Sequence, residues 1–192
     1  DRFSQFALLA ANEAILSSGL KNSQENWSEN AGIILGSSIG GIETINHSYK
    51  QVFEEGHNRL HPLTIPKIMN NSATSLISIE HGIQGPSFTV SSACSSANHA
   101  MGLAYEAVKS RKSNIMITGG SESFLSFGGI KPWESLRVLS QNKCRPFSKG
   151  RDGLVHGEGA GIFVFESLDS AKKRKADVIA EVIGFSMSSD AS

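Results

Sequence analysis

Cys94 is the residue of this sequence whose surroundings are best suited to chemistry. Residues 88–93 favour a β-strand that ends in small residues, and a helix-forming run follows the cysteine at once. The free N–H groups at the start of such a helix, together with its dipole, favour thiolate over thiol. The same groups can stabilise the oxyanion that forms when the sulfur attacks a carbonyl carbon. The sequence therefore predicts a nucleophile that accepts an acyl group.

A second interpretation of Cys94 stays open from this segment alone, because a cysteine among alanine and serine residues is commonly a small buried hydrophobe. His99 is not expected to act as its base, since five residues along a helix turn a side chain about 140° away. We interpret His99 as a packing or interface residue. No histidines and cysteines have the spacing of metal ligands, so we expect no metal site. Four histidines lie in polar or turn-rich stretches and are expected to be solvated: His47, His57, His61 and His81.

The composition argues against several classes of function. The 192 residues include 18 basic and 18 acidic side chains, and this balance does not favour nucleic acid or an anionic membrane as a partner. No apolar run approaches the roughly 20 residues that span a bilayer, and no signal peptide opens the sequence. Cys94 and Cys144 lie in very different settings and do not form a disulfide framework. We therefore expect a reducing, cytoplasmic location.

Alternating helices and apolar strands are expected to position Cys94. Apolar residues from Phe3 to Ile15 recur at helical spacing, and Gly19 ends that helix. Residues 31–36 form a continuous apolar run, typical of a strand buried on both faces, and a tight glycine corner follows at 37–41. The other expected elements, in chain order, are helices at 45–55 and 68–80, a strand at 88–93, a helix at 97–109, strands at 114–118 and 161–165, a short basic helix at 169–175 and a strand at 178–185.

This order of elements predicts an α/β fold with a mostly parallel, buried sheet. No internal repeat, low-complexity tract or linker divides the sequence, so we expect a single domain. The basic run from Lys172 to Lys175 is interpreted as a solvated helix face.

Four segments resemble one known family. The stretch Ser92-Ala93-Cys94-Ser95-Ser96 resembles the nucleophile motif of the β-ketoacyl-acyl carrier protein synthases, the condensing enzymes of fatty acid and polyketide synthesis. Three further segments agree in order and spacing: residues 1–3, the glycine corner at 36–41, and the glycine-rich signature at 145–161. The resemblance runs essentially from end to end and is closest to the type II elongating enzymes. Residues 127–129 and 133–134 also resemble members that serve specialised products, such as nodulation-factor synthases.

The resemblance implies a thiolase-like fold, a layered αβαβα sandwich built from two similar halves. Residues 1–192 match most of the N-terminal half and would form a single partial domain, without the family's first strand and without its C-terminal half. The family places two catalytic histidines, a lysine and the second oxyanion donor in that other half. We therefore expect this fragment to be inactive in condensation by itself.

The function that the resemblance implies is that of a 3-oxoacyl-acyl carrier protein synthase. Cys94 would take an acyl chain from acyl carrier protein as a thioester, which separates loading from condensation. Malonyl-acyl carrier protein would then lose carbon dioxide, and its enolate would attack the thioester in a decarboxylative Claisen condensation. The resemblance implies acyl carrier protein as the partner, a homodimer as the assembly, and no cofactor.

The resemblance also places six residues in the acyl pocket. Ile39 matches a position that limits acyl chain length in the family. Thr64, Ile65 and Met69 match positions that contribute to the pocket across the dimer interface. Gly129 and Trp133 match positions that line the pocket and the approach to the active site. Each apolar residue has the alternative interpretation of plain core, because a pocket and a core both bury hydrocarbon.

Charged residues divide into two expected groups. Acyl carrier protein is acidic, and Arg59 and Arg137 match positions on the basic surface where it docks in the family. Four charged residues of the glycine-rich signature are interpreted as structural, because such a turn needs charged partners for its backbone: Arg145, Arg151, Asp152 and Glu158.

Three rival functions remain. A thiolase-fold acyltransferase would use coenzyme A thioesters, although the signature at 145–161 argues against it. A non-catalytic chain-length partner subunit would shape a cavity, but such subunits typically lack the nucleophile that Cys94 supplies. A generic binding module would carry an inert, buried cysteine. Because half a sandwich exposes a large apolar face, we also expect aggregation or tight pairing of the isolated fragment.

Overall fold

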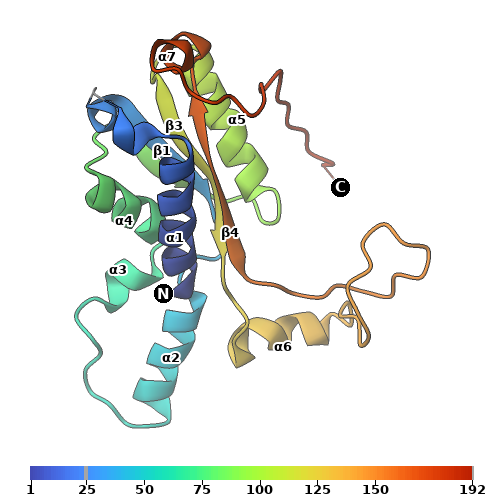
Figure 1. Cartoon of the computed structure of the whole chain (residues 1–192). Coiled ribbons are helices and arrows are strands. Elements are labelled where there is room, and N and C mark those ends of the chain that lie inside the picture. The colour runs from blue at the N-terminus through green and yellow to red at the C-terminus, as the bar shows by residue number, and fades with distance from the viewer. Residues whose placement is uncertain (24–25, 192) are drawn as a thin grey trace.

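The structure, a computed structural model, describes residues 1–23 and 26–191 (Figure 1). Two short 3-10 helices, at Leu20–Asn22 and Trp27–Asn30, lead from the first helix into the first strand. The other elements, in chain order, are α1 (Arg2–Ser17), β1 (Ala31–Gly36), α2 (Ile42–Phe53), α3 (Thr64–Ile68), α4 (Ser72–His81), β2 (Ser87–Val90), α5 (Ser96–Lys109), β3 (Ile115–Glu122), α6 (Phe127–Ser135), β4 (Gly159–Glu166) and α7 (Leu168–Lys173).

The strands form one sheet in the order β2-β1-β3-β4. Strand β1 is parallel to both β2 and β3, with Ile33 opposite Ile117, whereas β4 runs antiparallel to β3. The mostly parallel sheet is therefore confirmed, and its two central strands are almost fully buried. The expectation that residues 161–165 form a strand is confirmed, but the expected burial of that strand is wrong. Exposed and half-buried residues alternate along most of β4. Ile162 and Val164 pack on the core that α1 covers, whereas Phe163, on the opposite face, is 52% exposed.

Helices cover both faces of the sheet (Figure 1). Successive residues of a strand point to opposite faces, so Ile33 and Leu35 pack against α1 and α4, while Ile34 packs with Ala100 and Ala104 of α5. The fold is thus α/β with a helix–sheet–helix layering. Among the described residues, no helix is both long enough and apolar enough to cross a membrane.

The helix expected at 68–80 is confirmed as α4, but it begins four residues later than expected, after an extended break at Met69 that separates it from α3. Tertiary contacts explain the break. The backbone N–H of Gly41 donates to the Ile68 carbonyl oxygen at 3.2 Å, and the Thr89 hydroxyl donates to the Asn70 carbonyl oxygen at 3.2 Å. Both bonds are accepted by carbonyl groups beside the break. Through them the break is linked to the glycine corner on one side and to β2, the strand that precedes Cys94, on the other.

The glycines after residue 118 do not close the third strand. Strand β3 runs on through Gly119 and Gly120 to Glu122. Gly119 has a φ of 138°, and a Cβ at this position would overlap the Gly161 carbonyl group of β4. Gly119 thus serves a close approach to β4, and Gly120 serves a close approach to Ala97 of α5, so neither glycine forms a turn.

Residues 178–185 do not form the expected strand, and the structure shows no regular secondary structure there. A strand needs a neighbour to take up its backbone hydrogen bonds, and this segment pairs with neither edge of the sheet. It is held instead through Phe185, whose ring packs against α5 at Gly102 and lies 6.4 Å from the His99 ring. His99 is therefore a packing residue, as expected.

Helix α6 was absent from the expected elements, because Gly128, Gly129 and Pro132 all disfavour a helix. The Ser126 side chain starts it by accepting a hydrogen bond from the Gly129 N–H at 3.2 Å.

Near the C-terminus, the expectation of a solvated basic face on 172–175 is wrong for Arg174. Its guanidinium binds Glu166 and the Ser18 carbonyl oxygen, and its side chain is only 16% exposed.

Candidate active site

Cys94 lies in a tight turn between the carboxyl end of β2 and the start of α5, as the sequence predicts. Its thiol is free and its residue exposed. The preceding Ala93 has a φ of 47°, a left-handed conformation that costs an alanine roughly 1 kcal/mol. The expectation of a buried cysteine is therefore wrong within the described residues, while the reactivity of the thiol stays a prediction. The turn holds the sulfur outside the sheet, beside the amino end of a helix.

Three serines stabilise this turn. The Ser96 hydroxyl accepts a hydrogen bond from the Ser92 N–H at 2.8 Å and donates to the Ala93 carbonyl oxygen at 2.6 Å. The Ser95 hydroxyl donates to the Ser92 carbonyl oxygen at 2.7 Å. These short local bonds satisfy backbone groups that the turn would otherwise leave unpaired. The serines flanking Cys94 thus hold its backbone in place.

The first glycine corner lies against both sides of the Cys94 turn. On the strand side, the Ser37 N–H donates to the Val90 carbonyl oxygen at 3.1 Å, and the Ser91 hydroxyl donates to the Ser38 carbonyl oxygen at 3.2 Å. On the helix side, a Cβ on Gly36 would overlap the backbone of Ser96 and Ala97. Only glycine allows the start of α5 to sit this close to the end of β1.

Glu122, at the end of β3, organises this corner and was missed by the sequence reasoning. Its carboxylate accepts hydrogen bonds from the Ser38 N–H at 2.6 Å, from the Ser38 hydroxyl, and from the Ser37 hydroxyl at 3.3 Å. The available signal was an acidic residue two positions after a glycine pair that follows an apolar strand. Its partners lie more than 80 residues earlier, so pattern alone could not identify them.

The structure brings Ile39 and the segment of Thr64, Ile65 and Met69 into one neighbourhood. Ile39 belongs to the glycine corner, which is bound to the end of α3 through Gly41. The side chains of Ile39, Ile65 and Met69 are 37%, 62% and 49% exposed, and Thr64 is half-buried. Plain core is therefore the wrong interpretation for these three apolar residues in this chain.

Gly129 and Trp133 lie on α6, whose main helix contact is with α2. The Trp133 ring packs edge-on against His156 with centroids 4.8 Å apart, and His156 packs in the same way on Phe124 at 4.8 Å. The Nε2 atom of His156 is buried and has no hydrogen-bond partner among residues 1–23 and 26–191. These contacts give His156 a packing role that its sequence position did not reveal.

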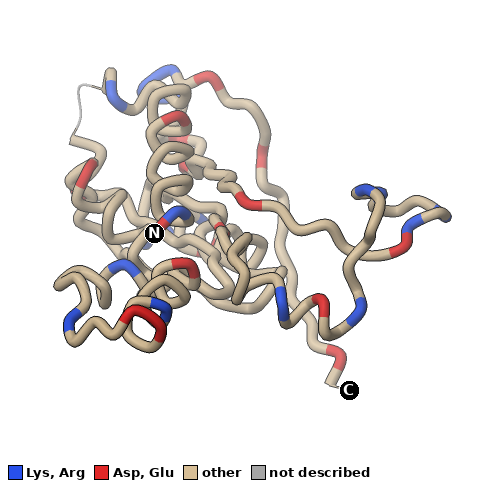
Figure 2. The backbone as a smooth tube through the Cα atoms, turned by 90° about the horizontal axis from the view of Figure 1, so that it is seen from below, with Lys and Arg blue, Asp and Glu red and all other residues tan. Residues whose placement is uncertain are grey.

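Arg59 and Arg137 are both exposed and lie outside the helices and strands. Figure 2 shows basic and acidic residues interspersed along the chain. Their exposure leaves both arginines accessible to a partner. Their use in docking stays a prediction.

The signature at 145–161 is a network of turns. Hydrogen bonds from the Ser140 hydroxyl at 2.7 Å and from the Asn142 amide at 2.8 Å, with Arg145 nearby, lower the pKa of Asp152 to about 2. Glu158 accepts from the Leu125 N–H at 3.0 Å and pairs with Arg2 at 2.7 Å. These contacts agree with a structural role for Asp152 and Glu158.

His81 departs from the expected solvated state. Burial, with a smaller contribution from Lys21, lowers its pKa, and its ring lies 6.4 Å from the Trp27 ring. Its Nε2 atom is buried without a partner in the part of the chain that the structure describes. We attribute this to packing against Trp27 rather than to chemistry.

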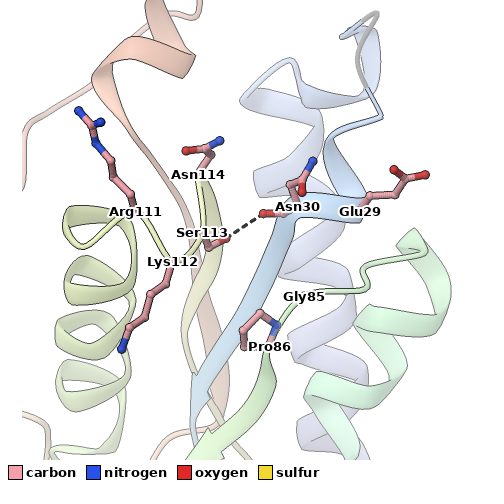
Figure 3. Close-up of a pocket in the computed structure, with 8 residues that line it drawn as sticks. All are labelled: Glu29, Asn30, Gly85, Pro86, Arg111, Lys112, Ser113 and Asn114. Carbon is pink, nitrogen blue, oxygen red and sulfur yellow. Dashed lines mark hydrogen bonds between the residues drawn. The ribbon is translucent and has the colours of Figure 1, made fainter.

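A hollow lies at the amino ends of β1 and β3, whereas Cys94 follows the carboxyl end of β2 (Figure 3). It has a volume of about 220 Å³ and is crossed by a hydrogen bond of 2.9 Å from the Ser113 hydroxyl to the Asn30 carbonyl oxygen. Within the described residues, no group of three His, Cys, Asp or Glu side chains is placed to hold a metal ion. The residues that line this hollow are Glu29, Asn30, Gly85, Pro86, Arg111, Lys112, Ser113 and Asn114.

Comparison with known proteins assigns the chain to a family. Residues 1–171 match the family model described as "Beta-ketoacyl synthase, N-terminal domain". The whole chain is 39% identical to 3-oxoacyl-[acyl-carrier-protein] synthase 2 of Staphylococcus aureus, covering 48% of that protein. It is 41% identical to nodulation protein E of Rhizobium sp. (strain N33), covering 47% of that protein. The chain thus spans about half the length of the curated relatives it matches.

A solved structure agrees with this assignment. A type II polyketide ketosynthase, solved with its acyl carrier protein and a bound hexaketide, superposes with a TM-score of 0.80 at 26% identity. The match covers 92% of this chain and 46% of that one. The fold is therefore the thiolase-like fold that the sequence predicted, and the chain belongs to the beta-ketoacyl synthase family.

Proposed function

We propose that residues 1–192 are the N-terminal half of a 3-oxoacyl-acyl carrier protein synthase in which Cys94 carries the acyl chain. One observation carries the proposal: the free, exposed thiol lies in a strained turn at the amino end of α5, in a chain of this family. A helix amino end favours negative charge on the sulfur and on an adjacent oxyanion.

The proposed reaction has two stages. In loading, the Cys94 thiolate attacks the acyl carbonyl carbon, a new S–C bond forms, the bond to the carrier's sulfur breaks, and the released thiolate takes up a proton. In condensation, malonyl-acyl carrier protein loses carbon dioxide, and its enolate carbon attacks the Cys94 thioester. The carbon–sulfur bond to Cys94 then breaks, which frees the thiolate and leaves the 3-oxoacyl product on the carrier. We propose that the catalytic histidines of the family come from the rest of the protein.

The exposed apolar side chains of Ile39, Ile65 and Met69 support a hydrocarbon pocket that further protein completes. We propose that a second copy supplies part of it, in a homodimer, and that Thr64, Gly129 and Trp133 also line the pocket or its entrance. Strand β2 lies at one edge of the sheet, so its outer backbone groups are available to pair with the second copy.

We propose acyl carrier protein as the partner, with Arg59 and Arg137 in its docking surface. The relative from Staphylococcus aureus names this carrier, and the polyketide ketosynthase was solved bound to one. Both arginines are exposed, as docking requires. The two free cysteines support a reducing compartment, and we propose the cytoplasm.

Acyl transfer to the full-length protein tests this proposal. Incubation with palmitoyl-acyl carrier protein, followed by intact mass and peptide mapping, should show one acyl group on Cys94. The Cys94→Ala variant should show none, while Cys144→Ala, which removes the other exposed cysteine, should match wild type. An adduct on another residue would reject the nucleophile. Equal loading from palmitoyl-coenzyme A would favour the coenzyme A-dependent alternative.

A further inference from the structure

Glu122 binds the glycine corner with both carboxylate oxygens. One oxygen accepts from the Ser37 hydroxyl, and the other accepts from the N–H and the hydroxyl of Ser38. Ser37 is buried and Glu122 is half-buried. Hydrogen bonds to an ionised group in such surroundings are about twice as strong as neutral ones. The glycine corner follows β1, and it therefore depends on the charged Glu122 side chain of the neighbouring strand β3.

The corner in turn fixes the backbone on either side of Cys94. Ser38 accepts from the Ser91 hydroxyl, Ser37 donates to Val90, and Gly36 lies under the start of α5. Glu122 makes none of these contacts itself, so it acts through the corner. Glu122 therefore affects the thiol by fixing the position of the backbone on either side of Cys94.

The residue that follows this pair of serines is Ile39. Its side chain is 37% exposed and lies on the corner that is bound to the end of α3 through the Gly41 N–H and Ile68. A shift of Ser37 and Ser38 would therefore move Ile39 relative to both Cys94 and α3. Under the proposed function Ile39 limits the acyl chain, so its position relative to the sulfur would set how much hydrocarbon fits beside the thiol.

We propose that Glu122 is a positioning residue that sets acyl chain-length selectivity by fixing Ile39 relative to Cys94. This inference rests on the proposed function, because it requires Cys94 to carry the acyl chain. With Glu122 in place, the corner is rigid and Ile39 limits long chains. Without the carboxylate, the two serines lose their common acceptor, and Ile39 yields to a longer chain.

The test uses Glu122→Gln in the full-length protein, which keeps the size of the side chain. Glutamine offers one acceptor oxygen and turns an NH2 group towards donors, so the set of three bonds cannot form. The initial rate of acyl adduct formation on Cys94 is measured with hexanoyl- and palmitoyl-acyl carrier protein. We expect the palmitoyl-to-hexanoyl rate ratio to rise about tenfold, the size of effect that a small change in an apolar pocket produces.

Glu166→Gln is the matched control. Glu166 is also a carboxylate in the β3–β4 pair, with a side chain only 6% exposed, but it lies opposite Ile115 at the other end of β3. Its loss should lower stability and leave the rate ratio within about twofold of wild type. A ratio that changes equally in both variants would overturn the inference, as would equal slowing of both donors in Glu122→Gln.

Ser38→Ala keeps the inference testable if Glu122→Gln does not fold. This variant retains the Ser38 N–H bond to Glu122 and removes only the hydroxyl bond. The rate ratio should rise in the same direction by a smaller factor, and an unchanged ratio in a folded Ser38→Ala protein would refute the positioning role. Failure of the proposed function looks different, because wild type itself would then form no adduct on Cys94.

Discussion

The two ends of the parallel strands are built on different principles. At the carboxyl end, glycines bring the start of α5 close to β1, Ala93 adopts a strained conformation, and the Cys94 thiol stays exposed. At the amino end, α7 closes the sheet with a nearly buried ion pair of 2.6 Å between Arg174 and Glu166. The two ends therefore differ in the exposure of their functional groups, since the Cys94 thiol is open to solvent and the ion pair is nearly buried.

The carboxylates at the two ends show the same difference. Among the described residues, Glu122 has no ion-pair partner and is bound by hydroxyl and N–H groups of the glycine corner. Glu166 is bound by the Arg174 guanidinium through both oxygens and by the Ser170 hydroxyl. A carboxylate that gathers donors from one turn shapes that turn. A carboxylate paired with a cation from another element joins the two elements.

Arg174→Ala should give the largest change in stability and sharpen the comparison at the amino end. It leaves the Glu166 carboxylate buried and unpaired and removes the contact of 2.6 Å with the Ser18 carbonyl oxygen. We expect the free energy of unfolding to fall by about 3 kcal/mol, measured by denaturant titration. Acyl transfer to Cys94 should be unchanged where the variant is folded, and slower transfer would break the separation of the two ends. Lys172→Ala, on the exposed side of α7, is the control and should change stability by less than about 0.5 kcal/mol.

Gly36→Ala should affect stability and reactivity together. The added methyl group would overlap the backbone of Ser96 and Ala97, so the start of α5 must move away from β1. We expect a loss of about 2 kcal/mol in unfolding free energy and slower acylation of Cys94, measured by intact mass. Gly184→Ala is the control, since no atom lies within 4 Å of its Cβ position. Unimpaired acylation in a destabilised Gly36→Ala protein would contradict the link between corner and thiol.

Ala93→Gly should give the smallest effect and the opposite sign. Glycine adopts a φ of 47° without strain, although it also adds freedom to the unfolded chain. We expect unfolding free energy to rise by about 0.5 kcal/mol, while acylation of Cys94 slows because the turn is less rigid. The same substitution at Ala104, inside α5, should instead cost at least about 1 kcal/mol. Destabilisation by Ala93→Gly would show that the turn carries no strain.

Much of the fold followed from local patterns. The apolar spacing of α1 and α5 and the continuous apolar run of β1 each predict an element that the structure contains. The failures lie where tertiary contacts outweigh local preference. The break at Met69 comes from bonds to Gly41 and Thr89, and Gly119 of β3 serves a close approach to β4. Residues 178–185 are rich in strand formers but find no strand beside them.

The candidate site divides in the same way. Its nucleophile was identifiable from the sequence, because a cysteine between a strand and a helix start is a local arrangement. The two carboxylates bound by distant partners, Glu122 and Glu158, and the aromatic contacts of His156 were not. Each depends on residues that are dozens of positions away, whose approach no local pattern encodes.

By itself, the sequence determined the α/β class, the family resemblance and the place of Cys94 in a strand-to-helix turn, because hydrophobic period and turn chemistry act over short stretches of chain. The tertiary structure alone decided that Glu122 organises the glycine corner, that Arg174 is an ion-pair partner rather than a solvated cation, and that Ile39 and Met69 remain exposed. The physical reason is that burial and hydrogen-bond pairing are properties of packed elements, and they exist only once distant segments have met.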